Sequence, residues 1–175
     1  MILKPRLITR IAMFAALIYV LAWATAPLLN VKLTFFMAFA AGFLWGLVPG
    51  VIAAGLGQWL WTFFNPYGPA MPWVAVAQVV GLAACGALGR AFRNSILHTA
   101  SEKSRILILA TAAVCCTLVF FVPVSVADAW VYQPFWPRMI GGLPFVGISL
   151  AANLLIFPLL FRIVLHLYER ERALL

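Results

Sequence analysis

The chain has 175 residues, of which 66% are hydrophobic and 9% are charged, and its formal net charge is +8. This composition, with a mean hydropathy of +1.08, excludes a soluble domain and indicates an integral membrane protein. The positive charge requires no nucleic acid as a partner, because basic cytoplasmic loops facing anionic lipid are usual in membrane proteins.

The apolar stretches predict an all-α integral membrane protein, a compact bundle of six transmembrane helices in one domain, residues 1–175. A helix needs about 20 apolar residues to cross the hydrocarbon core of a bilayer. In chain order, the predicted helices are Ile11–Leu29, Leu33–Val48, Val51–Phe64, Trp73–Phe92, Ile106–Val126 and Met139–Leu165. The second and third are short and meet at Pro49-Gly50, so we expect a packed hairpin whose ends rest on neighbouring helices.

The first apolar segment also has features of a secretory signal peptide. Basic residues between Lys4 and Arg10 precede it, and Ala24-Thr25-Ala26 follows near its end. Pro27 would directly follow the cleavage point, so we expect this segment to be retained as the first helix.

The distribution of basic residues predicts the orientation of the bundle. With six crossings and a cytoplasmic amino terminus, the inner side carries Lys4, Arg6, Arg10, Arg90, Arg93, Lys103, Arg105, Arg162, Arg170 and Arg172. Only Lys32 and Arg138 then lie outside. We therefore expect both termini in the cytoplasm and the protein in the inner (plasma) membrane.

Polar and aromatic residues gather around the second outer loop, in the stretch GQWLWTFFNPYGPAMPW. Gln58, either Trp61 or Thr62, and Asn65 follow helical spacing and would share one face of the third helix, and Tyr67 lies just beyond them. Gln78 lies about 7 Å below the start of the fourth helix, close to the depth of Gln58. These residues are candidate substrate contacts, because amides and phenols give directional hydrogen bonds and aromatic faces stack on planar solutes.

The last outer segment, Ala127–Arg138, adds Asp128, Trp130 and Tyr132 to the candidate contacts. Its prolines suggest a stiff loop. Three structural alternatives remain open. The buried amides of Gln58, Gln78 and Asn153 could bond between helices, and the aromatic residues could form an interfacial belt. Asp128 could pair with Arg138 or Lys32.

No catalytic constellation is present in the sequence, so we expect a non-enzymatic protein without cofactor or metal. His98 and His166 fall on the cytoplasmic side, away from carboxylates or cysteines that would complete a metal or acid–base site. Cys85, Cys115 and Cys116 lie in apolar helices and are expected to be packing residues. The chain also lacks a phosphate-binding loop, so energy for any transport must come from another subunit.

Ala12 and Ala16 lie four residues apart on the first helix, the small-residue spacing that lets two membrane helices approach closely. With this pair, the six helices, the inner termini, the glycine-rich stretch FAAGFLWGLVPGVIAAGLG and the NPYGP loop, the chain resembles a known family. The family is that of the substrate-binding (S) components of energy-coupling factor (ECF) transporters, which take up vitamins and related micronutrients.

The resemblance implies that the chain captures a small-molecule substrate from outside with high affinity. It further implies association with a transmembrane coupling protein and two ATPase subunits, followed by toppling in the membrane to release the solute. Ala12 and Ala16 match the family's small-residue motif that contacts the coupling protein. The family's pocket lies under the loops between helices one and two, three and four, and five and six.

Two other functions compete with substrate capture. A membrane scaffold of the cell envelope, similar to small rod-shape proteins, would explain size and topology but not the polar and aromatic residues of the outer loops. An autonomous transporter would need paired membrane-embedded charges or broken-helix repeats, which the sequence lacks. The aromatic content favours a flat heterocyclic solute, with a vitamin or its precursor as the first expectation.

Overall fold

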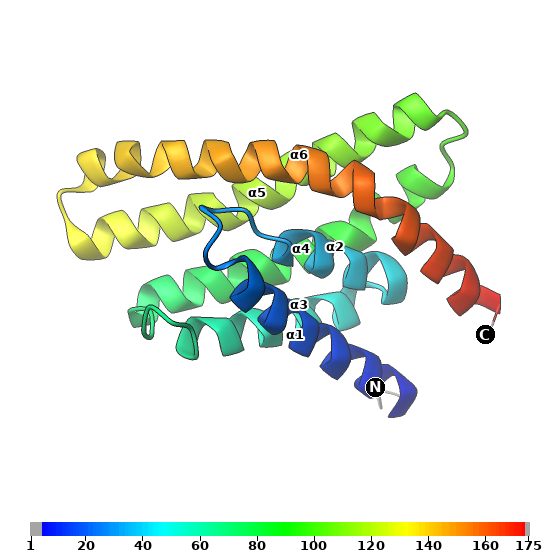
Figure 1. The fold of residues 1–175 in the computed structure, drawn as a ribbon, viewed down its shortest axis with the longest axis horizontal. Helices are drawn as coiled ribbons and strands as arrows, with labels where there is room; N and C mark the ends of the chain where they lie inside the picture. The colour runs from blue at the N-terminus through cyan, green and yellow to red at the C-terminus, as the bar shows by residue number, and fades with distance from the viewer. Residues whose placement is uncertain (1–4, 174–175) are drawn as a thin grey trace.

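The computed structural model describes residues 5–173, which fold into six α-helices without a strand in that range (Figure 1). The helices are α1 (Pro5–Thr25), α2 (Thr34–Trp45), α3 (Leu47–Phe63), α4 (Pro72–Leu97), α5 (Glu102–Tyr132) and α6 (Phe135–Ala173). The all-helical class predicted from the sequence is confirmed. Lys4, one of the predicted inner basic residues, lies outside the described residues.

Four of these helices, α1, α4, α5 and α6, are long and apolar enough to cross a membrane. The other two have 12 and 17 residues, which at helical rise gives about 18 and 25 Å, less than the roughly 30 Å of hydrocarbon. Almost every residue of α2 is buried, because α1, α3, α4, α5 and α6 all pack against it. The predicted hairpin of two short helices is therefore present, but its predicted junction at Pro49-Gly50 is wrong. The chain turns at Gly46, and Pro49 falls in the first turn of α3, where a proline is tolerated. The crossing of the membrane by all six helices stays a prediction.

Glycines allow α2, α3 and α4 to pack backbone against backbone. A Cβ added at Gly42 would overlap the carbonyl oxygen of Gly86, and one added at Gly86 would overlap that of Gly50. We call these three residues the glycine seam. Close approach of this kind gives membrane helices their van der Waals contact, since hydrocarbon offers no hydrophobic drive between them. The α2–α3 turn also depends on glycine, because Gly46 has a φ of +98°.

Phenylalanine side chains join α2 to the long hairpin of α5 and α6. The ring centroids of Phe35 and Phe120 are 4.8 Å apart, and those of Phe43 and Phe161 are 5.0 Å apart. These are tilted and edge-to-face contacts, the favourable arrangements for aromatic pairs. They form the centre of the main core cluster.

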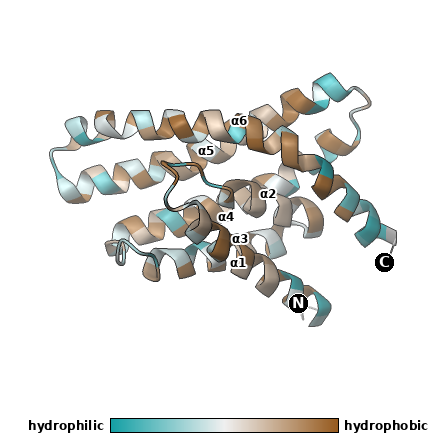
Figure 2. Ribbon diagram, in the orientation of Figure 1, coloured by the Kyte–Doolittle hydropathy of each residue, from teal (hydrophilic) through white to brown (hydrophobic). Residues whose placement is uncertain are grey.

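The two ends of the bundle differ in chemistry. The described chain begins and ends at the same end, which also holds the α4–α5 connection and here is called the terminal end (Figure 1). Hydrophilic residues mark this end at the start of α1, the last turns of α6 and the α4–α5 connection (Figure 2). The α1–α2, α3–α4 and α5–α6 connections lie toward the other end, here called the loop end. A basic terminal end fits the predicted cytoplasmic termini, which stay a prediction.

Several predicted helix ends are wrong. The expected outer loop over residues 127–138 is mostly helical, because α5 continues to Tyr132 and α6 begins at Phe135. Conversely, α1 ends at Thr25, so the expected short turn is an eight-residue segment, 26–33. Hydropathy marks where a chain is apolar, whereas a helix ends where its backbone hydrogen bonds end, and the two limits need not coincide.

Candidate ligand-binding site

A cavity of about 620 Å³ lies at the loop end, within the range of small-molecule sites. It is lined by α1, the 26–33 segment, the first residue of α2, α3, α4, α5 and the α3–α4 loop, residues 64–71, here called the lid. The lining residues are Ala22, Thr25, Ala26, Pro27, Leu28, Leu29, Asn30, Lys32, Thr34, Gln58, Trp61, Asn65, Tyr67, Gly68, Pro69, Ala70, Met71, Val74, Gln78, Asp128 and Tyr132. All the predicted substrate contacts except Trp130 line this one cavity.

Gln58, Thr62 and Gln78 form a hydrogen-bonded group at the base of the cavity, which we call the amide floor. The Thr62 hydroxyl donates to Gln78 Oε1 at 2.9 Å, and Gln58 Nε2 donates to Thr62 Oγ1 at 3.2 Å and to Gln78 Oε1 at 3.3 Å. Gln58 and Thr62 are 5% and 1% exposed, so their polar groups depend on these bonds. The predicted convergence of two amides from neighbouring helices is observed.

The amide floor leaves two polar groups for a ligand. Within residues 5–173, the structure gives no protein hydrogen bond to the Gln58 carbonyl oxygen or from the Gln78 amide nitrogen. Reversing both amides would exchange these roles and still leave one acceptor and one donor. The floor therefore leaves one acceptor and one donor, the types of group that can pair with an N–H and a C=O on a ring.

The Asn65 side chain forms hydrogen bonds with the backbone of the lid and of the last turn of α3. Its amide nitrogen donates to the carbonyl oxygens of Trp61, Thr62 and Gly68 at 3.0, 3.2 and 2.9 Å, and its Oδ1 accepts from the Tyr67 amide at 2.8 Å. Carbonyls in the last turn of a helix lack intrahelical donors, so this side chain closes the end of α3. Asn65 lines the cavity, but its hydrogen bonds shape the loop above the ligand.

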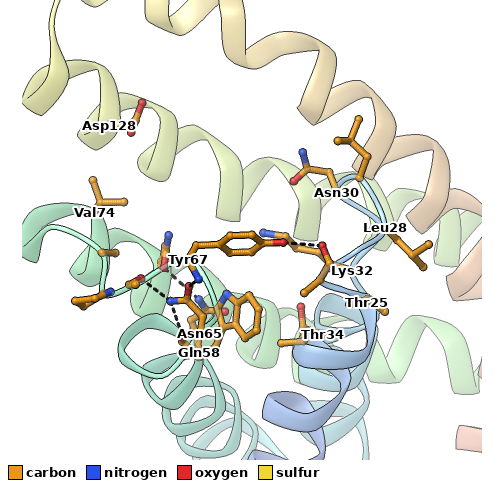
Figure 3. Close-up of a pocket in the computed structure, with 18 of the residues that line it drawn as sticks. Thr25, Leu28, Asn30, Lys32, Thr34, Gln58, Asn65, Tyr67, Val74 and Asp128 are labelled. Atoms are coloured by element: carbon orange, nitrogen blue, oxygen red, sulfur yellow. Dashed lines mark hydrogen bonds between the residues drawn. The ribbon is translucent and has the colours of Figure 1, made fainter.

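The lid is fastened to α1 and to the segment that follows it. The Tyr67 hydroxyl donates to the Ala26 carbonyl at 2.9 Å, and its ring extends from the lid toward the 26–33 segment (Figure 3). Tyr19 and Trp23 donate to the Phe64 carbonyl at 3.0 and 3.2 Å. The same Trp23 meets Trp61 edge-to-face, with centroids 6.2 Å apart. These contacts hold the lid against α1 and the segment that follows it.

Lys32 lines the cavity, although we did not select it from the sequence. Its ammonium lies 5.2 Å from the Phe120 ring centroid and 5.7 Å from that of Phe121. Burial lowers the pKa of this group to about 8. The available signal was its position, since it is one of only two basic residues predicted on the outer side.

Asp128 has the salt-bridge partner that we considered. Arg138 Nε donates to Asp128 Oδ2 at 2.7 Å, and the guanidinium lies 4.6 Å from the Tyr132 ring centroid. Figure 3 shows Asp128 on α5, away from the amide floor. Trp130 is 73% exposed and absent from the cavity lining, so we do not include it in the proposed site.

Other residues singled out from the sequence lie away from the cavity. Asn153 is buried and donates to Thr117 Oγ1 at 3.0 Å, which is the helix-to-helix alternative we had left open for it. His98 and His166 are exposed, and no cluster of metal-ligating residues occurs within the described range. Ala12 and Ala16 are both exposed on the outward side of α1, whereas Ile11, Ala15 and Ile18 face the bundle.

The fold and the cavity define a helical membrane protein with a solute-sized, polar-floored site at one end. The family model described as ECF-type riboflavin transporter, S component, matches residues 3–165 of the chain. The chain belongs to this family. It is therefore a multi-pass membrane protein and the substrate-capture subunit of a transporter. Comparison with curated proteins gave no match, and comparison with solved structures gave none either. Membership favours substrate capture over the scaffold alternative.

Proposed function

We propose that the chain captures a flat heteroaromatic vitamin, riboflavin or a close flavin relative, in the cavity at the loop end. The observation that carries this proposal is the amide floor, with one free donor and one free acceptor below a 620 Å³ cavity. The family description, which names riboflavin, agrees with that chemistry.

The fit follows from the edge of the flavin ring. Its pyrimidine part carries carbonyl groups on either side of an N–H, so one carbonyl and the N–H can pair with Gln78 Nε2 and Gln58 Oε1. Trp61 supplies an aromatic face in the same cavity, and the Tyr67 ring crosses the mouth (Figure 3). A site that hydrogen-bonds a planar ring in this way rejects rings lacking the matching groups, because its own buried polar groups would be left unpaired.

The proposed partners follow from the family and from α1. We propose that a transmembrane coupling protein contacts Ala12 and Ala16, which are exposed, and that two ATPase subunits hydrolyse ATP for uptake across the inner (plasma) membrane. Small exposed side chains four residues apart permit close helix contact. In this arrangement both termini face the cytoplasm and the cavity faces outward.

The test is the identity of the small molecule that travels with the protein. The full chain is purified gently in detergent and denatured, and the released compounds are identified by mass spectrometry, with Gln78→Leu as the matched control. We expect a stoichiometric flavin from the unmodified protein and less from the variant. A well-folded protein that releases no flavin, and that does not bind added riboflavin in a fluorescence titration, would refute the proposal.

A further inference from the structure

Lys32 brings a positive charge to the cavity without a protein counter-charge. The ion pairs of the described residues are Arg10–Glu171, Arg138–Asp128 and Arg162–Glu102, and none includes Lys32. The structure also gives no hydrogen bond from its ammonium to a protein acceptor within residues 5–173. Its neighbours are the faces of Phe120 and Phe121, at 5.2 and 5.7 Å.

Aromatic faces compensate a half-buried ammonium only in part. A cation over a ring gains some electrostatic attraction, but it loses the hydration that three N–H donors would have in water. Buried charges in proteins are normally paired, and an unpaired one at a cavity wall marks a place where a partner is missing. The cavity itself is the space from which such a partner can reach Lys32.

The carboxylate that shares this cavity does not fill that role. Asp128 is held by Arg138 at 2.7 Å, and burial is the cause of the lowered Lys32 pKa, without an opposing carboxylate. The other titratable groups at the cavity are the phenols of Tyr67 on the lid and Tyr132 on α5. With Asp128 neutralised by its own partner, the charge that remains at the cavity is the positive charge of Lys32.

We propose that Lys32 is a specificity-determining residue that pairs with an anionic oxygen group on the captured solute. The inference rests on the proposed function, because it concerns the same cavity and adds a charge requirement to a heteroaromatic ligand. A phosphate ester on the chain attached to the ring is the chemical class that fits, since an ammonium binds phosphate as a point charge. The amide floor then hydrogen-bonds the ring, and Lys32 binds the anionic group.

The matched probes are riboflavin and riboflavin 5′-phosphate, which differ by one phosphate. Binding of each to the full chain is measured by flavin fluorescence for the unmodified protein, for Lys32→Met and for Lys103→Met. Lys103 is an exposed lysine at the start of α5, at the terminal end, so it controls for loss of one positive charge. Lys32→Met should fold, because it exchanges a half-buried charge for an apolar side chain of similar length.

At about pH 7 we expect riboflavin 5′-phosphate to bind the unmodified protein about tenfold or more tightly than riboflavin, as charge-assisted hydrogen bonds contribute more than neutral ones. The preference should vanish in Lys32→Met and persist in Lys103→Met. Equal or weaker binding of the phosphate ester, or a preference that survives in Lys32→Met, would overturn the inference while leaving riboflavin capture intact.

A second measurement tests the inference without any flavin. The folded pKa of Lys32, about 8, lies below its ordinary value of 10.5. Its charge therefore destabilises the ligand-free fold fully below pH 8, and this cost is relieved as the pH rises from 8 toward 10.5. The melting temperature of the unmodified protein should therefore rise, relative to that of Lys32→Met, between about pH 7 and about pH 9.

If neither flavin binds a well-folded protein, the proposed function fails and this pH comparison decides about Lys32. A relative rise supports an uncompensated cation in the cavity. Parallel melting curves for the unmodified protein and Lys32→Met would show that Lys32 is already paired or solvated, and would overturn the inference.

Discussion

Replacing Gln78 with leucine tests the amide floor directly. The substitution keeps the side chain at a similar size but makes it apolar, and it removes the acceptor of two hydrogen bonds, from Thr62 at 2.9 Å and from Gln58 at 3.3 Å. A net intramolecular hydrogen bond contributes about 1 kcal/mol, and Gln58 and Thr62 remain bonded to each other at 3.2 Å. We therefore expect the free energy of unfolding to fall by about 1–2 kcal/mol.

The effect on ligand should be larger than the effect on folding. Without the Gln78 amide, the matching ring carbonyl stays unpaired in a desolvated site, which costs about 1–3 kcal/mol, or roughly 5- to 150-fold in riboflavin Kd. Fluorescence titration gives the Kd, and thermal unfolding in detergent gives the stability. Asn153→Leu is the control, because Asn153 bonds to Thr117 in the core and not in the cavity, so it should change stability without changing Kd. An unchanged Kd in folded Gln78→Leu would refute the reasoning.

Three further outcomes follow from the packing. Gly86→Ala should lower the free energy of unfolding by about 1–3 kcal/mol, because the added Cβ overlaps a backbone carbonyl of α3. Gly55→Ala, whose added Cβ would have its nearest neighbour at 3.9 Å, should be almost neutral. Equal melting temperatures for the two variants would argue against the glycine seam. Asn65→Ala should speed proteolysis of the lid, and it should change the riboflavin Kd less than Gln78→Leu does. An unaltered cleavage rate would contradict the role of this side chain in closing the lid. Ala12→Trp combined with Ala16→Trp should abolish uptake in cells but leave riboflavin binding to the purified chain unchanged, since both residues face away from the cavity. Loss of binding would show that this face of α1 is wrongly assigned.

The sequence was informative wherever a single physical rule decided the outcome. Hydropathy located all six helices as apolar runs, although the break between α2 and α3 falls at Gly46 and not at the predicted Pro49-Gly50. Helical spacing brought Gln58 and Gln78 to similar depth, and the observed hydrogen bond between them agrees. The α3–α4 loop, which lines the cavity, was singled out from its concentration of polar and aromatic residues.

The sequence was uninformative where the role of a residue depends on the direction of its side chain and on the groups that it contacts. The residue type alone does not distinguish an asparagine that contacts a ligand from one that closes a helix end, so the hydrogen bonds of Asn65 within the lid were not predictable. Lys32 looked like an ordinary loop lysine, and only the positions of Phe120 and Phe121 show that it lies over apolar rings. Helix ends failed for a similar reason, since hydropathy does not report where backbone hydrogen bonding stops.

The fastening of the lid has a kinetic consequence. Tyr19 and Trp23 hold the Phe64 carbonyl, and Tyr67 holds the Ala26 carbonyl, so a solute can pass this side of the cavity only when several bonds open together. Such an opening is a cooperative step that precedes diffusion of the solute, and we expect association to be slower than the diffusional limit. Weakening the lid should then raise the association and dissociation rates together, whereas weakening the amide floor should shorten only the residence time of the bound molecule.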